Sequence, residues 1–320
     1  LLQSGHKVYI YMYGDGVVFE WNKDAYQKLT NLPNPSFIIP ASYIKTVLKE
    51  CKVAKTDAIV ATASSTLLHS KIVARNHGAT LLYYVQHMEQ HMFDSAYDKA
   101  LSELTYCDPC PFITIDSWVE KRIKATTGKN NIYTVMQGIH NKHLFDNKRE
   151  KIPNTVLTYV NTRKFKNHQN TVEIIKGTLD QFKWITYGTP QPVIEHENVR
   201  HIGYVNHAEL AKEMQQAEIY LHNSWAEAHA LPPLEAMYAG CRVFATKVGT
   251  HYLPDDYPYF IDPANPVRTA LKLLTQNPVE YDVRGKILAK LSWEKATDTW
   301  ERILIEGYKE PVFPEIVNCF

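Results

Sequence analysis

The sequence predicts an α/β protein with two Rossmann-like domains, each built on a parallel sheet. Short apolar runs alternate with segments of helical period along the chain, which is typical of strands joined by helices that cover both faces of a sheet. The runs are continuously apolar, as expected of strands buried on both faces. A length of 320 residues also suits two domains better than a single core.

The first series of elements occupies residues 1–150. Residues 1–6 have the pattern of a helix end, whereas a doubly wound domain normally begins with a strand before that helix. We therefore expect the leading strand to be missing ahead of residue 1. The predicted strands are 8–13, 36–39, 58–62, 80–85, 112–115 and 132–136, and the predicted helices are 41–51, 65–76, 94–106 and 118–126.

The second series occupies residues 151–291 and begins after the polar stretch 146–151, just before Pro153. In open parallel sheets, ligands bind beyond the carboxyl ends of the strands, so two facing domains predict a cleft with the functional site between them. The predicted strands are 155–160, 183–187, 199–202, 219–222, 242–245 and 259–261, and the clearest predicted helices are 170–179 and 207–216.

Composition and charge exclude several classes of protein. A net charge of +1 lacks the basic excess of a protein built mainly to bind a phosphate polymer. No apolar run reaches the roughly 18 residues of a membrane-spanning helix, and the first residues lack the order of a secretory signal. Five cysteines, an odd number spread over a long chain, indicate reduced thiols and a cytoplasmic location.

The strongest motif is the stretch 223–240, which follows the predicted strand 219–222. Pro232 and Pro233 suit the first turn of a helix, where a missing N–H group costs little, and Gly240 suits its C-terminal cap. Glu227 is therefore predicted to lie in the loop before the helix, and Glu235 in its first or second turn.

This arrangement can bind a nucleotide. The start of a helix near Leu231 presents unsatisfied N–H groups and a partial positive charge, which favour a diphosphate. Glu235 could accept hydrogen bonds from a ribose diol, and Glu227 could hold sugar hydroxyls. The alternative is that both glutamates only favour the helix dipole.

The whole stretch resembles the E-x7-E motif of retaining GT-B glycosyltransferases of family 4. The resemblance implies a GT-B fold, a nucleotide-sugar donor and transfer with retention. Ala228 and Ala230 stand where the family commonly has glycine, and His229 between them is expected to face the sugar or the phosphate. The matching positions are Glu227, Leu231, Pro232, Leu234, Glu235, Ala236, Met237 and Gly240.

The resemblance extends over roughly 155–300. Residues 197–205 resemble the strand and turn that hold the nucleobase, so Tyr204 is expected to contact the donor together with His229, Ala230, Leu231 and Glu235. Residues 243–249 resemble the following strand and glycine turn. Residues 292–294 resemble the start of a C-terminal helix, 292–320, that returns to the first domain.

A basic turn follows the first strand of the second domain, within 159–168. Cations there can stabilise the charge that develops on a leaving diphosphate, without a metal. The resemblance implies that Arg163 and Lys166 have this role, and Lys164 is a rival for Lys166. An exposed basic loop is the alternative. The sequence contains no Asp-x-Asp triplet of the kind that holds a divalent metal, which agrees with this solution.

In the first domain, residues 81–89 read as a strand that runs into a polar loop. They are similar to a subgroup that includes rhamnosyltransferases. This similarity implies that His87 contacts the substrate, with Gln86 and Glu89 beside it. A structural histidine at a strand end is the alternative reading.

A zinc site is a further alternative. His87 and His91 are four residues apart, and Cys107 and Cys110 form a CxxC pair. With 14 histidines in the chain such spacings arise by chance, so we predict no metal and no cofactor beyond a nucleotide-sugar substrate.

The acceptor stays open between a glycan, a lipid-linked sugar, a protein and a modified nucleobase. A modest basic helix face formed by Lys121, Arg122 and Lys124 could make peripheral membrane contact, although a solvated face explains it as well. Two other functions remain on the same fold, namely a nucleotide-sugar epimerase and a non-catalytic nucleotide-sugar binding module.

Overall fold

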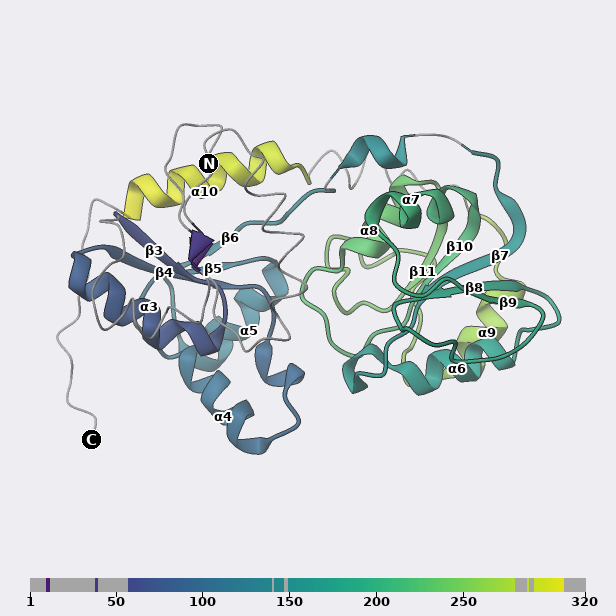
Figure 1. Cartoon of the computed structure of the whole chain (residues 1–320), viewed down its shortest axis with the longest axis horizontal. Coiled ribbons are helices and arrows are strands. Elements are labelled where there is room, and N and C mark those ends of the chain that lie inside the picture. The colour runs from purple at the N-terminus through teal and green to yellow at the C-terminus, as the bar shows by residue number, and fades with distance from the viewer. Residues whose placement is uncertain are drawn as a thin grey trace.

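A computed structural model describes residues 10–11, 38–39, 57–139, 141–146, 149–279, 287 and 291–307. They form two large parallel sheets with their helices, which lie side by side and are called here the first and second domains (Figure 1). The predicted α/β class with parallel sheets is confirmed. The expected leading strand and the predicted helix 41–51 lie outside the described residues.

The first domain contains a four-stranded sheet in the order β3-β4-β5-β6, parallel throughout. A separate parallel pair is formed by β1 (Ile10–Tyr11) and β2 (Ile38–Ile39). The sheet consists of β3 (Ala58–Ala61), β4 (Thr80–Val85), β5 (Phe112–Thr114) and β6 (Ile132–Thr134), and its helices are α3 (Ser64–His77), η2 (Glu89–Met92), α4 (Ala96–Thr105) and α5 (Ser117–Thr127).

Glu89, which is 25 residues away along the chain, supplies the carboxylate that caps the start of α3. The N-cap residue of α3 is Ala63, which has no side chain that can accept a hydrogen bond. Instead, the Glu89 carboxylate accepts hydrogen bonds from the Ser64 N–H at 2.9 and 3.0 Å and from the Ser64 hydroxyl. Glu89 therefore stabilises the positive end of α3.

The second domain contains a five-stranded parallel sheet in the order β11-β10-β7-β8-β9. The predicted strand 259–261 contributes only one bridge, between Ala245 and Phe260. The strands are β7 (Ile152–Tyr159), β8 (Lys183–Tyr187), β9 (Val199–His201), β10 (Ala217–His222) and β11 (Arg242–Ala245), and the helices are η3 (Lys142–Phe145), η4 (Lys164–Lys166), α6 (His168–Lys176), α7 (His207–Gln216), α8 (Leu231–Tyr238) and α9 (Pro266–Thr275).

The chain passes between the domains twice, and the two passages touch. A Cβ atom added to Gly138 would lie 2.8 Å from the Cα atom of Ser292. After the second passage, α10 (Trp293–Gly307) packs against the first domain, where the Trp300 ring meets Tyr84 edge-on at 5.1 Å between centroids (Figure 1). The resemblance implied such a returning helix.

Among the helices that the structure describes, none is both long enough and apolar enough to cross a bilayer.

Candidate active site

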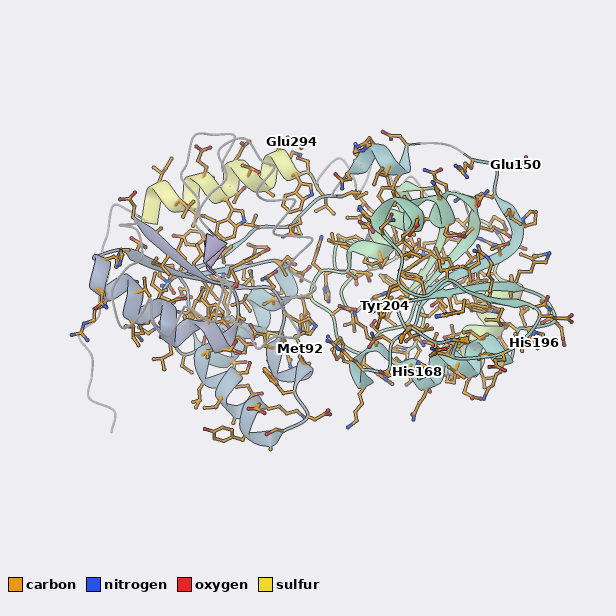
Figure 2. The ribbon with its side chains drawn as sticks, in the orientation of Figure 1. Met92, Glu150, His168, His196, Tyr204 and Glu294 are labelled. Carbon is orange, nitrogen blue, oxygen red and sulfur yellow. The ribbon has the colours of Figure 1, made fainter. Side chains whose placement is uncertain are left out.

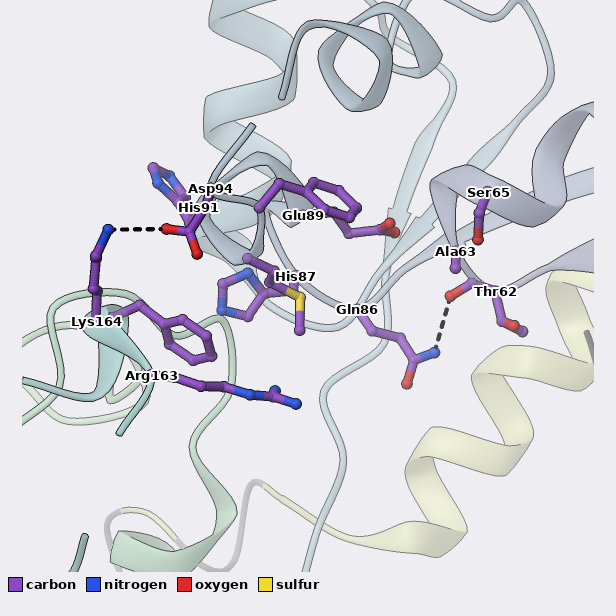
Figure 3. A pocket seen from close by; sticks show the side chains of 13 residues that line it. Thr62, Ala63, Ser65, Gln86, His87, Glu89, His91, Asp94, Arg163 and Lys164 are labelled. Carbon is purple, nitrogen blue, oxygen red and sulfur yellow. Dashed lines mark hydrogen bonds and ion pairs between the residues drawn. The ribbon is translucent and has the colours of Figure 1, made fainter. Parts of the chain in front are cut away.

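The carboxyl ends of strands from both sheets face a common cleft of about 810 Å³ (Figure 3). Its wall combines the ends of β3 and β4 with the basic turn after β7. The lining residues are Thr62, Ala63, Ser65, Gln86, His87, Glu89, His91, Met92, Phe93, Asp94, Arg163, Lys164 and Phe165. The cleft that two facing sheets predict is therefore present.

The motif helix α8 begins at Leu231, and Glu235 lies in its second turn. Pro232 and Pro233 have no N–H group, and the N–H of the N-cap residue Ala230 donates to the Gly249 carbonyl at 2.7 Å. In the described part of the chain, the Leu231 N–H is thus the donor of the first turn left without a backbone partner. It is available for an anion at the helix start.

The two alanines of the motif cause no backbone strain. Ala230 has a φ of −78°, and neither Ala228 nor Ala230 is among the described residues with positive φ. Both side chains are buried, and Ala228 packs into the hydrophobic core of the first domain. Alanine fits where the family commonly has glycine, and Ala228 helps to join the two domains.

Glu227 forms an ion pair with Lys166 and accepts a hydrogen bond from the Ser224 hydroxyl at 3.2 Å. Burial by itself would raise the pKa of Glu227, but the Lys166 charge, with smaller contributions from nearby histidines, holds that pKa below its ordinary value. The side chains of Lys166 and Glu227 are only 20% and 14% exposed, which strengthens their attraction. The carboxylate is therefore ionised and held in place.

The backbone joins the basic turn to the motif loop. The Phe165 carbonyl accepts hydrogen bonds from the N–H groups of Trp225 at 2.8 Å and Ala226 at 3.3 Å. Lys166 and Glu227, far apart in sequence, therefore belong to one unit.

The three cations of the basic turn have different surroundings. Lys164 pairs with Asp94 at 3.1 Å, and both side chains are about nine-tenths exposed, so this pair contributes little to stability. Arg163 extends into the cleft, with its guanidinium carbon 6.0 Å from the Phe165 ring centroid (Figure 3). No ion pair of Arg163 occurs within the described ranges. Lys166 is thus the lysine at the motif, and Lys164 lies on the rim.

His87 faces the basic turn from the first domain. Its ring centroid lies 6.0 Å from that of Phe165, and its Nδ1 atom lies 3.0 Å from the Met88 carbonyl oxygen. Its Nε2 atom is buried and has no hydrogen bond. Gln86 donates to the Thr62 carbonyl at 3.2 Å on the same wall. The structure thus places His87 and Arg163 in the lining of one cleft, and the Lys166–Glu227 pair adjoins this lining through Phe165.

Of the residues predicted to contact the donor, Glu235 is buried and Tyr204 is exposed. The Glu235 carboxylate is buried, and its Oε1 atom lies 2.8 Å from Nε2 of His207 at the start of α7. Tyr204 is 73% exposed, on the side of the second domain nearer to the first (Figure 2). His207 was not predicted as a site residue, because a single histidine after a capping asparagine belongs to no recognisable motif.

His229 lies against the first passage between the domains. Its Nε2 atom is 3.0 Å from the Gln137 carbonyl oxygen, and its ring meets Tyr252 edge-on at 5.4 Å. Burial lowers the pKa of this imidazole, so the neutral form is favoured. The structure shows this interdomain contact, and the expected contact of His229 with the donor stays a prediction.

Several buried polar atoms without hydrogen bonds lie at strand ends and turns on the facing sides of the two domains. The described residues contain ten such side-chain atoms, and six belong to residues at strand ends or turns between the domains. Folded proteins leave few such atoms, so each of them needs a partner such as water or a ligand. The six residues are His87, Asp116, His222, Asn223, His229 and His251.

The zinc alternative finds no geometric support. Within the described residues, no three or more His, Cys, Asp and Glu side chains come together as a group that could hold a metal ion. Cys107 is exposed and Cys110 is buried, and burial raises the pKa of the Cys110 thiol well above its usual range. A thiol of that kind is a poor metal ligand.

His222, at the end of β10, should make the fold sensitive to acid. Burial lowers its pKa to about 4, whereas the unfolded chain takes up this proton near the ordinary value of 6.5. The contribution of His222 to the free energy of unfolding is therefore fully present above about pH 6.5. It falls as the pH drops towards 4, by at most about 3 kcal/mol. We expect His222→Asn to flatten the fall in melting temperature between pH 7 and pH 4.5. An unchanged slope would contradict this assignment.

Comparison with known structures identifies the architecture as the GT-B fold of glycosyltransferases. A variant of S. aureus TarM, in complex with fondaparinux, alpha-GlcNAc-glycerol and UDP, matches with a TM-score of 0.64 and 17% identity over 82% of this chain and 58% of that one. HepE of Anabaena in complex with UDP-glucose matches with a TM-score of 0.61 and 12% identity over 94% and 89% of the two chains. This chain thus spans little more than half the length of TarM.

The pneumococcal O-GlcNAc transferase GtfA, in complex with UDP and GlcNAc, is also similar, with a TM-score of 0.62, 14% identity and coverage of 84% of this chain and 60% of that one. Residues 146–252 match the model of the family described as glycosyl transferases group 1. This segment contains the basic turn and the motif. No curated protein matches the chain. The matched family model and the similar folds are those of glycosyltransferases.

Proposed function

We propose that the protein transfers a sugar from a nucleotide-sugar donor to an acceptor hydroxyl, with retention and without a metal. A uridine diphosphate sugar is the donor to test first. One observation supports this most directly. Glu227 and Lys166 pair beside the start of α8, Arg163 of the same basic turn extends into the adjoining cleft, and His87 lines that cleft from the first domain. The similar TarM, GtfA and HepE structures hold UDP or UDP-glucose.

In this proposal the diphosphate lies at the Leu231 N–H, with Arg163 and Lys166 beside it. The bond between the sugar C1 and the diphosphate oxygen breaks while the acceptor oxygen bonds to C1 on the same face. The acceptor proton passes to the departing phosphate oxygen. Both cations stabilise the negative charge that grows on the diphosphate, which is the work that a metal does elsewhere.

The remaining residues position the substrates. Glu227 holds sugar hydroxyls, and Glu235, oriented by His207, accepts the hydrogen bonds of the ribose diol. Exposed Tyr204 can stack on the base. His87 and the neighbouring cleft wall receive the acceptor. Tilting of the domains about the two passages would exclude water during transfer.

The test is a release assay for UDP with UDP-glucose and UDP-GlcNAc, a panel of sugar, lipid-linked, peptide and DNA acceptors, and EDTA. We expect acceptor-dependent release that EDTA leaves unchanged, and a product with the anomeric configuration of the donor. Arg163→Ala should lower turnover strongly. Arg268→Ala is a matched control because Arg268 is an exposed residue of α9 and lies outside the stretches assigned to the site.

Each alternative has its own outcome in this assay. An epimerase would change the donor sugar without an acceptor. A binding module would show a rise in melting temperature with UDP but no product across the panel. Loss of activity in EDTA, or an inverted product, would contradict the corresponding part of the proposal.

A further inference from the structure

The short loop 249–252 lies between the first domain and the donor side of the cleft. It follows the glycine turn after β11. Towards the motif, the Gly249 carbonyl accepts the Ala230 N–H at 2.7 Å, and the Tyr252 hydroxyl donates to the Ala230 carbonyl at 3.0 Å. Both contacts are made to the N-cap residue of α8. The loop therefore fixes the start of that helix.

The same loop packs directly against Glu227. A Cβ atom added to Gly249 would lie 2.3 Å from the Cβ atom of Glu227, which shows how closely the backbone approaches this side chain. Any shift of residue 249 moves the wall behind the carboxylate that pairs with Lys166.

On its other side, the loop meets the first domain through His251. The His251 ring stacks on Trp118 at 5.4 Å and an interplanar angle of 6°, and its Nδ1 atom lies 3.4 Å from Oδ1 of Asp116. Asp116 is fully buried. The Asp116 Oδ2 atom and the His251 Nδ1 atom both lack a hydrogen bond, so the two groups are within ion-pair range but not aligned.

We propose that Asp116 and His251 form a contact that tightens when the domains close and that positions the 249–252 loop, and through it Glu227 and the start of α8. Both are positioning residues, since neither touches the donor site directly. The inference rests on the proposed function, because its effect is read in the transfer reaction. It gives a role to a buried Asp116 carboxylate that leaves one oxygen without a hydrogen bond at the domain boundary.

Asp116 also has a local structural role, which the test must separate. Its Oδ1 atom caps α5 by accepting the Trp118 N–H at 2.6 Å. Asparagine caps helices about as well as aspartate, so Asp116→Asn keeps the cap and removes the charge that faces His251. His251→Gln removes the imidazole from the other side, where the residue is partly exposed and substitution threatens folding less.

The experiment is a double-mutant cycle of Asp116→Asn and His251→Gln, with kcat and the donor KM measured for each variant. We expect each single variant to lose about tenfold in kcat, within the range that coupled neighbours show, with the donor KM changed less than about twofold. The double variant should be no worse than either single variant. The rise in melting temperature with UDP should persist in all of them.

Asp255→Asn is the matched control. Asp255 lies a few residues further along and pairs with Lys247 at 3.0 Å on the open surface, so its loss should leave kcat unchanged. Additive losses in the cycle, or single losses below twofold, overturn the proposed positioning contact between Asp116 and His251. A wild-type chain that transfers no sugar overturns the proposed function and, with it, the proposed positioning contact. An active wild-type chain whose double-mutant cycle is additive overturns the positioning contact alone.

Discussion

Lys166→Ala should lower kcat by about 10²–10³-fold, the usual effect of removing one group that stabilises developing negative charge. Lys166 is the cation at the motif, paired with Glu227 and largely buried. Its loss removes a charge from the diphosphate site and leaves the Glu227 carboxylate without its cation, which also destabilises the fold. Measured kcat at saturating donor, together with melting temperature, separates the two effects.

Lys164→Ala is the matched control for this prediction. Lys164 lies two positions away in the same turn, but its partner Asp94 is exposed, and both groups are solvated. We expect less than about a twofold change in kcat, since exposed pairs contribute little. If Lys164→Ala reduced kcat more than Lys166→Ala, the roles assigned to the two lysines would have to be exchanged.

The second large effect is expected for Gly249→Ala, for two independent reasons. Gly249 has a φ of +75°, a conformation that costs an L-residue about 1–2 kcal/mol. The new methyl group would also lie 2.3 Å from the Cβ atom of Glu227 and 3.2 Å from that of Ala230, so the carboxylate or the loop must move. We expect kcat/KM to fall at least about tenfold, because small displacements at a catalytic site have large effects.

Gly128→Ala separates backbone strain from the steric clash. Gly128 ends α5 with a φ of +69°, and an added Cβ atom would have no neighbour within 4 Å. This variant should lose a similar amount of stability in a denaturant titration and keep full activity. Equal activity losses in the two glycine variants would show that the position of Glu227 is not what Gly249 protects.

Local patterns in the sequence were sufficient to predict most of the described elements. The predicted strand 80–85 and helix 207–216 have the same bounds in the structure, because each is a complete apolar or amphipathic run between clear end signals. The predictions failed at one strand end and at one sheet edge. β7 begins at Ile152, earlier than predicted, since Ile152 pairs with Ala217 on the neighbouring strand. Residues 259–261 are reduced to one bridge.

The candidate site was predictable where chemistry follows one stretch of chain. Glu227, Leu231 and Glu235 fall on one loop and helix, so their spacing alone places them near a helix start. Arg163 and Lys166 came from residue type and from the resemblance. Glu89, expected beside the substrate, lies in the cleft wall and also caps α3, because that helix begins at an alanine and a carboxylate that follows another strand supplies the acceptor.

By itself, the sequence determined the order of elements, the two parallel sheets, and the motif with its helix start, since these depend on periodicity and neighbours along the chain. Only the tertiary structure decided which lysine meets Glu227 across 61 positions, that His207 holds Glu235 across 28, and that His229 reaches Gln137 across 92. Such contacts depend on how the ends of separate strands and helices converge in space, and a local sequence pattern does not determine which distant residues meet.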